Sequence, residues 1–479
     1  MTNIFLDSYI FRDINKYTDL RNLCDTCSSL SKLKKYINYK LNKQYSLMYY
    51  NDILFKTKIL NKIYNPCKQL HLNLNFNDKI TDVSVLSNVN TLKLSRCNYI
   101  TDITVLKNIN SLNLSYCKNI KDISVLRNVK ILDLSSCDKI INVSALSNIH
   151  TLNLSRCNNI TDVSALGNVY NLDLSYCDNI KDVRYLTNNN YLNLSGCKNI
   201  IDVSTLGNIH KLDLSYCDNI TDVSKLGNVY DLNLTCCEKI TDVSTLGNVT
   251  ILNLRFCNKI TDVSELGNVH SLNLWYCSNI TDVSALKNVY SLNLSCCKKI
   301  SNVSTLCNVY NLDISRCNIT KLNGLSNIYK LDLSFSDYIT DVSALTNVRI
   351  LNLSSCNNIT DVSALKNVYS LNLSCCHKIT DVSALTNVHT LNLSFCHNII
   401  DISALTNVHT LNLSFCKNIT NVSGLKNVHT LNLSFCKNIT DVSALKNVHI
   451  LDLTSCDKIT NFCGLSNIKV RTVRRCKNI

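Results

Sequence analysis

A twenty-residue repeat is the feature that most constrains this chain. Leu92, Leu112 and Leu132 are each twenty residues apart, and the pattern continues from Leu72 to Val470. Each unit reads approximately L-N-L-S-x-C-x-x-I-T-D-V-S-x-L-x-N-V-x-x. A fixed period of this length is typical of solenoids, in which each unit buries its apolar face only against its neighbours. The repeat therefore predicts a stack of about twenty coils in place of several globular domains.

Within one unit, the sequence predicts a short strand followed by turns. Leu92 and Leu94 have period-two spacing, so we expect a strand with both leucines pointing inward. Asp102 is placed to cap a tight turn through its side-chain oxygen. Twenty residues leave no room for a return helix, which favours 3₁₀ or turn structure on that side. The recurring asparagine at Asn88 and Asn108 is predicted to satisfy loop backbone groups along the array.

We expect three regions along the chain. Residues 1–67 do not repeat and have helical spacing, 68–470 form the array, and 471–479 are a basic partial repeat that caps the end. The net charge is +14, of which residues 1–67 contribute +6 and 469–477 contribute +5. The array itself is therefore close to neutral and lacks the basic stripe expected of a nucleic-acid-binding solenoid.

Cysteine usage favours an intracellular, cytoplasmic protein. Nineteen of the 27 cysteines occupy one repeat position, such as Cys97 and Cys117, and are better explained as small buried apolar residues than as disulfides. Glycans at strand sequons such as Asn113 would stop the coils from stacking. Residues 1–13 have no uninterrupted apolar core, so we expect no signal peptide. No apolar stretch is long enough to predict a membrane span.

The repeat consensus V-x-x-L-x-L-S-x-C-x-x-I-T-D-V resembles the leucine-rich repeat, in the cysteine-containing form found in F-box/leucine-rich-repeat proteins. It is shorter than the usual cysteine-containing unit. The D-V-S-A-L segment also looks like bacterial internalin repeats, which carry asparagine where this chain has cysteine. The whole arrangement is similar to repeat proteins of giant DNA viruses. The resemblance implies a horseshoe-like α/β repeat solenoid, with a parallel concave sheet and a turn or 3₁₀ convex side, that binds proteins.

The N-terminal region resembles a degenerate F-box. The usual Leu-Pro opening is replaced by Leu6-Asp7, and the later tryptophan is absent. The resemblance implies docking to a Skp-type adaptor of a cullin ubiquitin ligase, with the array recruiting a substrate. The adaptor-docking candidates are Ile10, Ile14, Leu20, Leu23 and Cys27. Two alternatives remain open: a stand-alone array whose N-terminal region is only a cap, and a secreted internalin-like adhesin, which the cysteine pattern disfavours.

Nothing in the sequence predicts an enzyme, a cofactor or a metal site. Almost every serine, histidine and aspartate belongs to a repeated position, whereas catalysis needs a unique convergent constellation. Cys24-x-x-Cys27 is a lone pair. A histidine recurs at His389, His409 and His429, and tyrosine occupies the same position in other coils. This ladder is open to two interpretations, a metal site or an exposed face.

The concave face is where we expect a partner to bind. Asparagine or aspartate nearly always lies between the two leucines, and serine usually follows them, so variation is concentrated on the second residue after the strand. Exposed aromatic and arginine side chains commonly dominate binding energies. Two adjacent coils replace the usual serine with bulky residues, and three later coils repeat phenylalanine. The concave-face candidates are Arg255, Phe256, Trp275, Tyr276, Phe395, Phe415 and Phe435. The alternative is neutral drift at tolerant surface positions.

Overall fold

The structure is a computed structural model that describes residues 38–61, 63, 65–460, 465 and 470–472. The chain forms two compact units, Met1–Asn199 and Ile200–Ile479. The adaptor-docking candidates Ile10, Ile14, Leu20, Leu23 and Cys27 lie outside the described residues. Among the described residues, no helix is long and apolar enough to cross a membrane.

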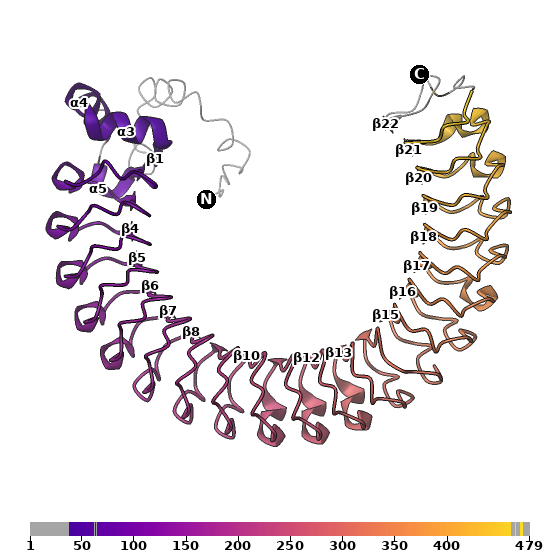
Figure 1. Cartoon of the computed structure of the whole chain (residues 1–479), viewed down its shortest axis with the longest axis horizontal. Coiled ribbons are helices and arrows are strands. Elements are labelled where there is room, and N and C mark those ends of the chain that lie inside the picture. Colours follow the sequence, from indigo (N-terminus) through magenta and orange to yellow (C-terminus); the bar gives the residue numbers. More distant parts are fainter. Residues whose placement is uncertain (1–37, 62, 64, 461–464, 466–469, 473–479) are drawn as a thin grey trace, which may run out of the picture. The chain divides into compact units, whose positions relative to one another are not determined.

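In each unit the strands form a parallel ladder with one strand per coil, on the inner side of that unit's curve (Figure 1). The first unit contains β1 (Tyr39–Lys40), β2 (Leu70–Asn73), β3 (Thr91–Lys93), β4 (Ser111–Asn113), β5 (Ile131–Asp133), β6 (Thr151–Asn153), β7 (Asn171–Asp173) and β8 (Tyr191–Asn193). The second contains β9 (Lys211–Asp213), β10 (Asp231–Asn233), β11 (Ile251–Asn253), β12 (Ser271–Asn273), β13 (Ser291–Asn293), β14 (Asn311–Asp313), β15 (Lys330–Asp332), β16 (Ile350–Asn352), β17 (Ser370–Asn372), β18 (Thr390–Asn392), β19 (Thr410–Asn412), β20 (Thr430–Asn432), β21 (Ile450–Asp452) and β22 (Val470–Thr472).

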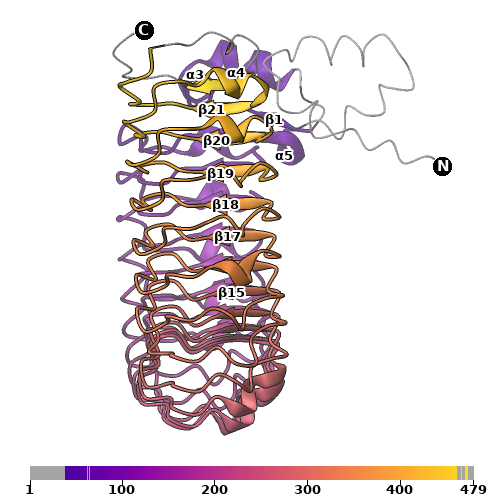
Figure 2. The same ribbon diagram turned by 90° about the vertical axis from the view of Figure 1, so that its right-hand side faces the viewer.

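Strand register follows the repeat, so equivalent residues lie side by side. Leu92 pairs with Leu112 across β3 and β4, and Leu252 pairs with Leu272 across β11 and β12. Figure 2 shows this stacking for β15 to β21. The leucines at these positions are almost completely buried, as is the isoleucine or valine that follows each cysteine and turn. The predicted repeat solenoid, with a parallel sheet on one side and turns on the other, is therefore confirmed.

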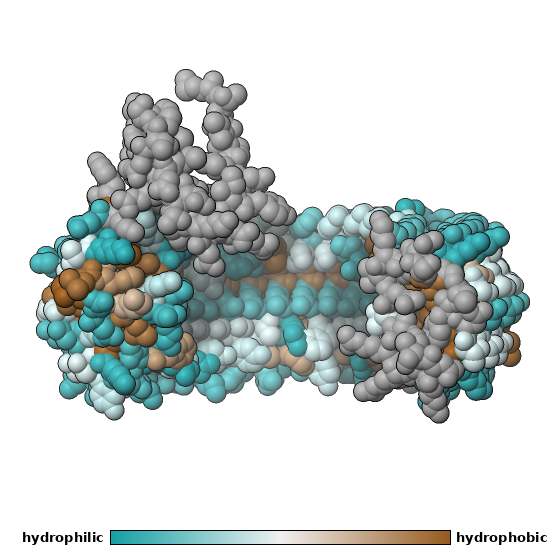
Figure 3. Space-filling model, turned by 90° about the horizontal axis from the view of Figure 1, so that it is seen from above, coloured by the Kyte–Doolittle hydropathy of each residue, from teal (hydrophilic) through white to brown (hydrophobic). Residues whose placement is uncertain are grey.

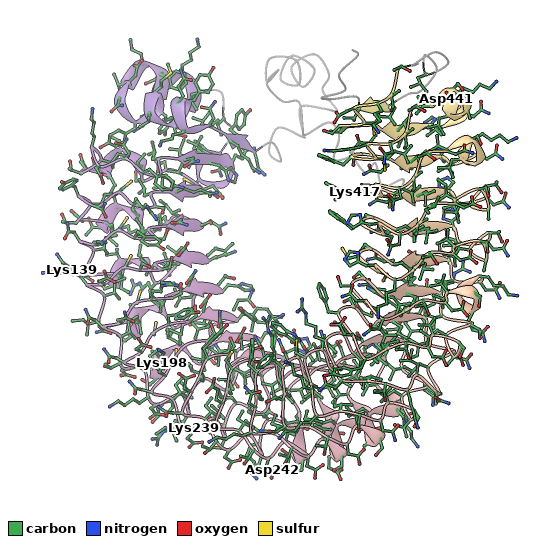
Figure 4. The ribbon with its side chains drawn as sticks, turned by 45° about the vertical axis from the view of Figure 1, so that its right-hand side comes forward. Lys139, Lys198, Lys239, Asp242, Lys417 and Asp441 are labelled. Carbon is green, nitrogen blue, oxygen red and sulfur yellow. The ribbon has the colours of Figure 1, made fainter. Side chains whose placement is uncertain are left out.

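Short 3₁₀ helices close many coils on the side opposite the sheet, as the repeat length predicts. Asp82 accepts a hydrogen bond from the Ser84 N–H at 2.8 Å, and Asp102 does the same for Thr104 at 2.9 Å. The predicted capping role of this aspartate is therefore confirmed. Figure 4 shows Asp242 and Asp441 at the outer rim. The 3₁₀ helices are η2 (Ser84–Leu86), η3 (Thr104–Leu106), η4 (Ser124–Leu126), η5 (Ser144–Leu146), η6 (Ser164–Leu166), η7 (Ser244–Asn248), η8 (Ser264–Asn268), η9 (Ser284–Asn288), η10 (Ser363–Leu365), η11 (Ser423–Leu425) and η12 (Ser443–Asn447).

In the described part of the chain, three helices precede the first repeat strand: α3 (Lys43–Asn51), α4 (Ile53–Leu60) and α5 (Pro66–Gln69). They cover the open end of the first coil. The Ser46 hydroxyl accepts from the Asn73 N–H at 2.9 Å, the Tyr50 hydroxyl donates to the Asp82 carbonyl at 2.8 Å, and the Lys56 ammonium donates to the Val85 carbonyl at 2.9 Å. These bonds satisfy backbone groups that a missing neighbouring coil would otherwise leave unpaired.

The cysteine ladder is buried and hydrogen-bonded. The Cys117 Sγ lies 3.2 Å from the carbonyl oxygen of Leu94, and the Cys277 Sγ lies 3.1 Å from that of Leu254. The described cysteines are free thiols. Burial raises the pKa of Cys117 to about 12 and that of Cys157 to about 11. The thiols therefore act as small packed groups with a weak donor, which agrees with the predicted buried role.

The asparagine that satisfies loop carbonyls is not the one predicted from the sequence. Asn88 and Asn108 are exposed. A different ladder, directly before the buried isoleucine, bridges neighbouring coils: the Asn119 amide donates to the Asn98 carbonyl at 2.8 Å, and the Asn179 amide donates to the Asn158 carbonyl at 2.7 Å. Asparagine recurs more regularly at the Asn88 position than at the Asn119 position, where lysine or tyrosine replaces it in several coils, so periodicity favoured the wrong ladder.

Candidate interaction surface

The solvent-facing side of the sheet is a polar floor fixed by hydrogen bonds within each coil. Asn113 accepts from both the N–H and the hydroxyl of Ser115, at 3.0 and 2.8 Å. Aspartate serves the same role in other coils, where Asp213 accepts from the Ser215 N–H at 2.9 Å. Figure 3 shows hydrophilic residues over much of this inner face. The floor is therefore uniform, and bulky neighbours provide its distinguishing features.

A left-handed backbone residue follows the floor in almost every coil. Arg96 has a φ of 60°, Tyr276 of 62° and Phe395 of 62°, and Gly196 is the rare glycine at this position. The conformation lets the backbone turn while staying in register, since the Arg96 N–H donates to the Ser115 carbonyl of the next coil at 2.8 Å. Non-glycine residues rarely adopt a positive φ. Glycine is rare at this position, so the repeat pattern did not predict the left-handed conformation.

The central candidates form one cluster just beyond the ends of β11 and β12. The Arg255 guanidinium carbon lies 3.5 Å from the Trp275 ring centroid and 5.1 Å from that of Phe256. Phe256 lies 4.9 Å from Trp275 and 5.1 Å from Tyr276, measured between ring centroids. Tyr276 is 43% exposed, whereas the other three are half-buried. The four residues therefore form a continuous aromatic surface with a cation lying on it.

Arg255 has an unusual environment within this cluster. Its Nε is enclosed and has no hydrogen-bond partner. Among the described residues, no carboxylate forms an ion pair with its guanidinium. Stacking on an aromatic face stabilises such a cation by roughly 0.5–2 kcal/mol, but leaves its N–H donors unused. Arg255 is therefore held in place as a donor without an acceptor. We refer to Arg255, Phe256, Trp275 and Tyr276 as the central cluster.

A hollow of about 360 Å³ adjoins the central cluster, on the floor between β12 and β15. Its polar walls include Asn273, Asn293, Asp313, Asp332 and Lys330. The coil of Trp275 continues directly from the same floor, since the backbone N–H of Trp275 donates to the Asn273 side chain at 3.0 Å. Sequence reasoning missed this hollow. The signal that could have found it is the pair Asp313 and Asp332, which puts aspartate in two successive coils.

The phenylalanine stripe also forms, just beyond the ends of β18, β19 and β20. The Phe395 and Phe415 ring centroids are 4.3 Å apart, as are those of Phe415 and Phe435, and both pairs are stacked. Phe395 is 38% exposed, and the other two are half-buried. The rings largely cover one another, so less apolar area is available to a partner than the sequence suggested.

Histidine and tyrosine rings form a second ladder at the start of the strands. The centroids of His389 and His409 lie 4.7 Å apart, those of His409 and His429 4.6 Å, and those of Tyr290 and Tyr310 4.8 Å. Among the described residues, no three histidine, cysteine, aspartate or glutamate side chains are grouped so that they could hold a metal ion. The ladder is a stacked, solvent-accessible edge, as the exposed-face interpretation predicts.

Comparison with known proteins defines the repeat type. A family model described as Leucine Rich repeat matches residues 344–366 and 424–446. The chain contains leucine-rich repeats. A comparison with curated protein sequences gave no significant match.

Three solved structures are similar to this chain. An internalin from Listeria monocytogenes is 24% identical, with 58% of this chain and 85% of that one covered and a TM-score of 0.42. The functional domain of InlJ from Listeria monocytogenes, described as including a cysteine ladder, is 22% identical, with coverage of 72% and 73% and a TM-score of 0.44. TLR13 in a complex with ssRNA13 is 21% identical, with coverage of 87% and 82% and a TM-score of 0.47. These similarities concern the fold alone.

Proposed function

We propose that this leucine-rich-repeat chain is a non-enzymatic scaffold that binds a partner protein on the solvent-facing side of its sheet. The observation that carries the proposal is the central cluster, in which the unpaired Arg255 lies 3.5 Å from the ring of Trp275. Tryptophan, tyrosine and arginine are the residues most enriched among binding hot spots. The surrounding floor of asparagine and serine repeats from coil to coil, so it cannot discriminate between partners, whereas the cluster can.

Neutral drift is the alternative explanation for the cluster. Drift predicts bulky side chains that project independently into solvent. The observed side chains instead contact one another: Phe256 is within 5.1 Å of both Trp275 and Tyr276, measured between centroids. A preorganised aromatic surface loses little conformational entropy when a partner binds, which supports a binding role.

The proposal is tested by capture from lysate with the full chain as bait. Trp275→Ala combined with Arg255→Ser should leave circular dichroism unchanged, because Arg255→Ser restores the usual residue of the repeat. The double variant should no longer capture the proteins that the wild-type chain captures specifically. A control variant, Tyr338→Ser, changes an aromatic residue that is 60% exposed outside the candidate surface, and should still capture them. Undiminished capture by the double variant would show that the central cluster is not the binding site.

We propose as the finer function that the chain is an F-box-like substrate receptor of a cullin ubiquitin ligase. The support is the sequence resemblance across Ile10, Ile14, Leu20, Leu23 and Cys27. The cap interpretation has support of its own, since α3 and α4 hydrogen-bond to the first coil through Tyr50 and Lys56. Capping by residues 43–60 and docking by residues 10–27 involve different segments, so one chain can do both.

Adaptor binding distinguishes the receptor from the stand-alone scaffold. The full-length wild-type chain should retain a Skp-type adaptor and a cullin. The double variant Ile14→Asp, Leu20→Asp should retain neither, but should still capture the proteins that bind the array. If wild type retains neither, the receptor proposal fails and the stand-alone scaffold remains.

We also propose an intracellular, cytoplasmic location. The free, buried thiols such as Cys117 and Cys277 support it, because their packing needs no disulfide. The alternative is a secreted adhesin. Titration of thiols in denatured protein from its native source tests the two: mostly free thiols support the cytoplasmic proposal, whereas a largely oxidised or glycosylated chain would favour secretion.

A further inference from the structure

Two carboxylates of like charge face each other in the hollow beside the central cluster. Asp313 and Asp332 are direct cross-strand partners on β14 and β15. Side chains at such positions have Cβ atoms about 4.5–5.5 Å apart, and like charges placed directly opposite are destabilising. Other floor aspartates avoid this arrangement by alternating with asparagine. The Asn113 amide donates to Asp133 at 2.7 Å, and the Asn233 amide donates to Asp213 at 3.0 Å.

No ion pair within the described residues neutralises both carboxylates. The Asn352 amide donates to Asp332 at 2.8 Å, and both bonds from Ser315 to Asp313 use its Oδ1. Lys330 also lines the hollow, but forms no ion pair with either carboxylate in the described part of the chain. Burial, with a contribution from Asp332, raises the pKa of Asp313, whereas the charge of Lys330 lowers it. Two carboxylates and one ammonium line the hollow, so its net charge is negative and it is complementary to a positively charged group.

Three coils earlier, Arg255 carries the opposite charge. Its guanidinium lies on the Trp275 ring, its Nε is enclosed without a hydrogen-bond partner, and no carboxylate among the described residues pairs with it. Arg255 lies on the same side of the sheet as the floor, because its N–H donates to the Asn253 side chain at 3.2 Å, as the serines of other coils do. This end of the surface is therefore complementary to an acidic group.

The spacing of the two charged ends fits an extended peptide. Strands in a sheet are about 4.8 Å apart, so the three steps from β11 to β14 span about 14 Å. An extended chain advances about 3.3–3.6 Å per residue, so four residues cover the same distance. Trp275 and Tyr276 lie just beyond the end of β12, which is between β11 and β14 in the sheet. An acidic and a basic side chain four residues apart, with an apolar one between them, therefore match this surface.

We propose that the sheet face from β11 to β15 binds an extended segment of a partner protein that carries charges of opposite sign at its two ends. The acidic side chain pairs with Arg255, and the basic side chain enters the hollow between Asp313 and Asp332. An apolar side chain between them packs against Trp275. This inference rests on the proposed binding function and adds the chemistry of the bound segment.

Trp275 provides the readout, because it is the single tryptophan of the chain. The full-length protein is titrated with the capped peptide Gly-Glu-Ser-Leu-Ser-Lys-Gly, while its indole emission is followed. Two further peptides replace either the glutamate or the lysine by glutamine. The peptide with both charges should bind about tenfold more tightly than either single-charge peptide.

Variants then assign each charge to its site. The double variant Asp313→Asn, Asp332→Asn places at both floor positions the asparagine that neighbouring coils already carry. It should abolish the preference for lysine and leave the preference for glutamate unchanged. Arg255→Ser should abolish the preference for glutamate and leave the preference for lysine unchanged. Asp452→Asn, a lone floor aspartate on β21, is the matched control and should change neither preference.

The proposal is overturned if the three peptides bind equally, if none changes the indole emission, or if the Asp313 and Asp332 variants retain the lysine preference. Self-association that Arg255→Ser abolishes would identify a second copy as the occupant and overturn it too. If Trp275→Ala still abolishes partner capture while the peptides are not discriminated, only this inference fails. If capture is independent of the central cluster, the proposed function fails as well.

Discussion

The Sγ of Cys396 lies 3.0 Å from the carbonyl oxygen of Leu373, one coil earlier in the stack. The same contact recurs between Cys416 and Leu393 at 3.1 Å. Each cysteine thus fills the interior between strand and turn and directs a weak donor at a buried carbonyl. The ladder is interrupted at Ser336, and that interruption gives a direct test of what the thiol contributes.

Ser336→Cys should stabilise the protein. Ser336 is 1% exposed, and its hydroxyl has no hydrogen-bond partner. A buried unsatisfied polar group costs about 1–3 kcal/mol, and a thiol at this position both packs better and reaches a carbonyl. We expect a higher urea midpoint, equivalent to about 1 kcal/mol. Ser355→Cys, at a half-buried position after the strand, is the control. A lower midpoint for Ser336→Cys would show that this coil is adapted to serine.

Asn189→Val should also stabilise the fold. Asn189 replaces the valine found at Val169 and is 3% exposed. Its amide donates to the carbonyls of Leu166 and Val169, but its Oδ1 has no partner. Removing the unsatisfied oxygen and filling the site with an apolar group should increase the free energy of unfolding by about 1 kcal/mol. Asn188→Val, on the surface, should change it little. Chemical denaturation distinguishes the two, and a destabilised Asn189→Val variant would contradict the argument.

Ser355→Gly should stabilise the chain because of its backbone conformation. Ser355 has a φ of 60°, where a Cβ is strained and glycine is not. The expected gain is about 1 kcal/mol, read from the denaturation midpoint. Ser354→Gly, one residue earlier at a position without positive φ, should instead destabilise the protein. Equal losses at both positions would show that the turn carries no strain.

Stability should fall at alkaline pH because of the buried thiols. Burial raises the pKa of Cys117 and Cys376 to about 12 in the folded protein, whereas the ordinary value is near 9. Below pH 9 the thiols are protonated in both states, so this contribution is fully present. Above pH 9 the unfolded chain loses protons that the folded chain retains, and stability declines until the folded pKa is reached. Denaturation midpoints measured from pH 7 to pH 11 test this prediction. A midpoint unchanged across that interval would contradict it.

The sequence predicted the features that repeat and missed those that depend on tertiary geometry. Leu92, Cys97 and Asp102 were assigned correctly, because burial and capping follow directly from spacing. The left-handed residue after the strand was missed because Arg96 and its equivalents are seldom glycine. The central cluster was recognisable because Trp275 and Arg255 break the serine rule. The hollow beside it was not, because its shape depends on how β12 to β15 curve.

The most direct test of the binding account is hydroxyl-radical footprinting of the full chain, free and with its captured partner. The modification rate of an aromatic side chain reports its solvent exposure. We predict that the partner protects Trp275 and Tyr276 several-fold, while Tyr338, which is 60% exposed beyond the strand of its coil, remains unchanged. Protection of Tyr338 with no change at Trp275 would place the partner elsewhere and contradict the account.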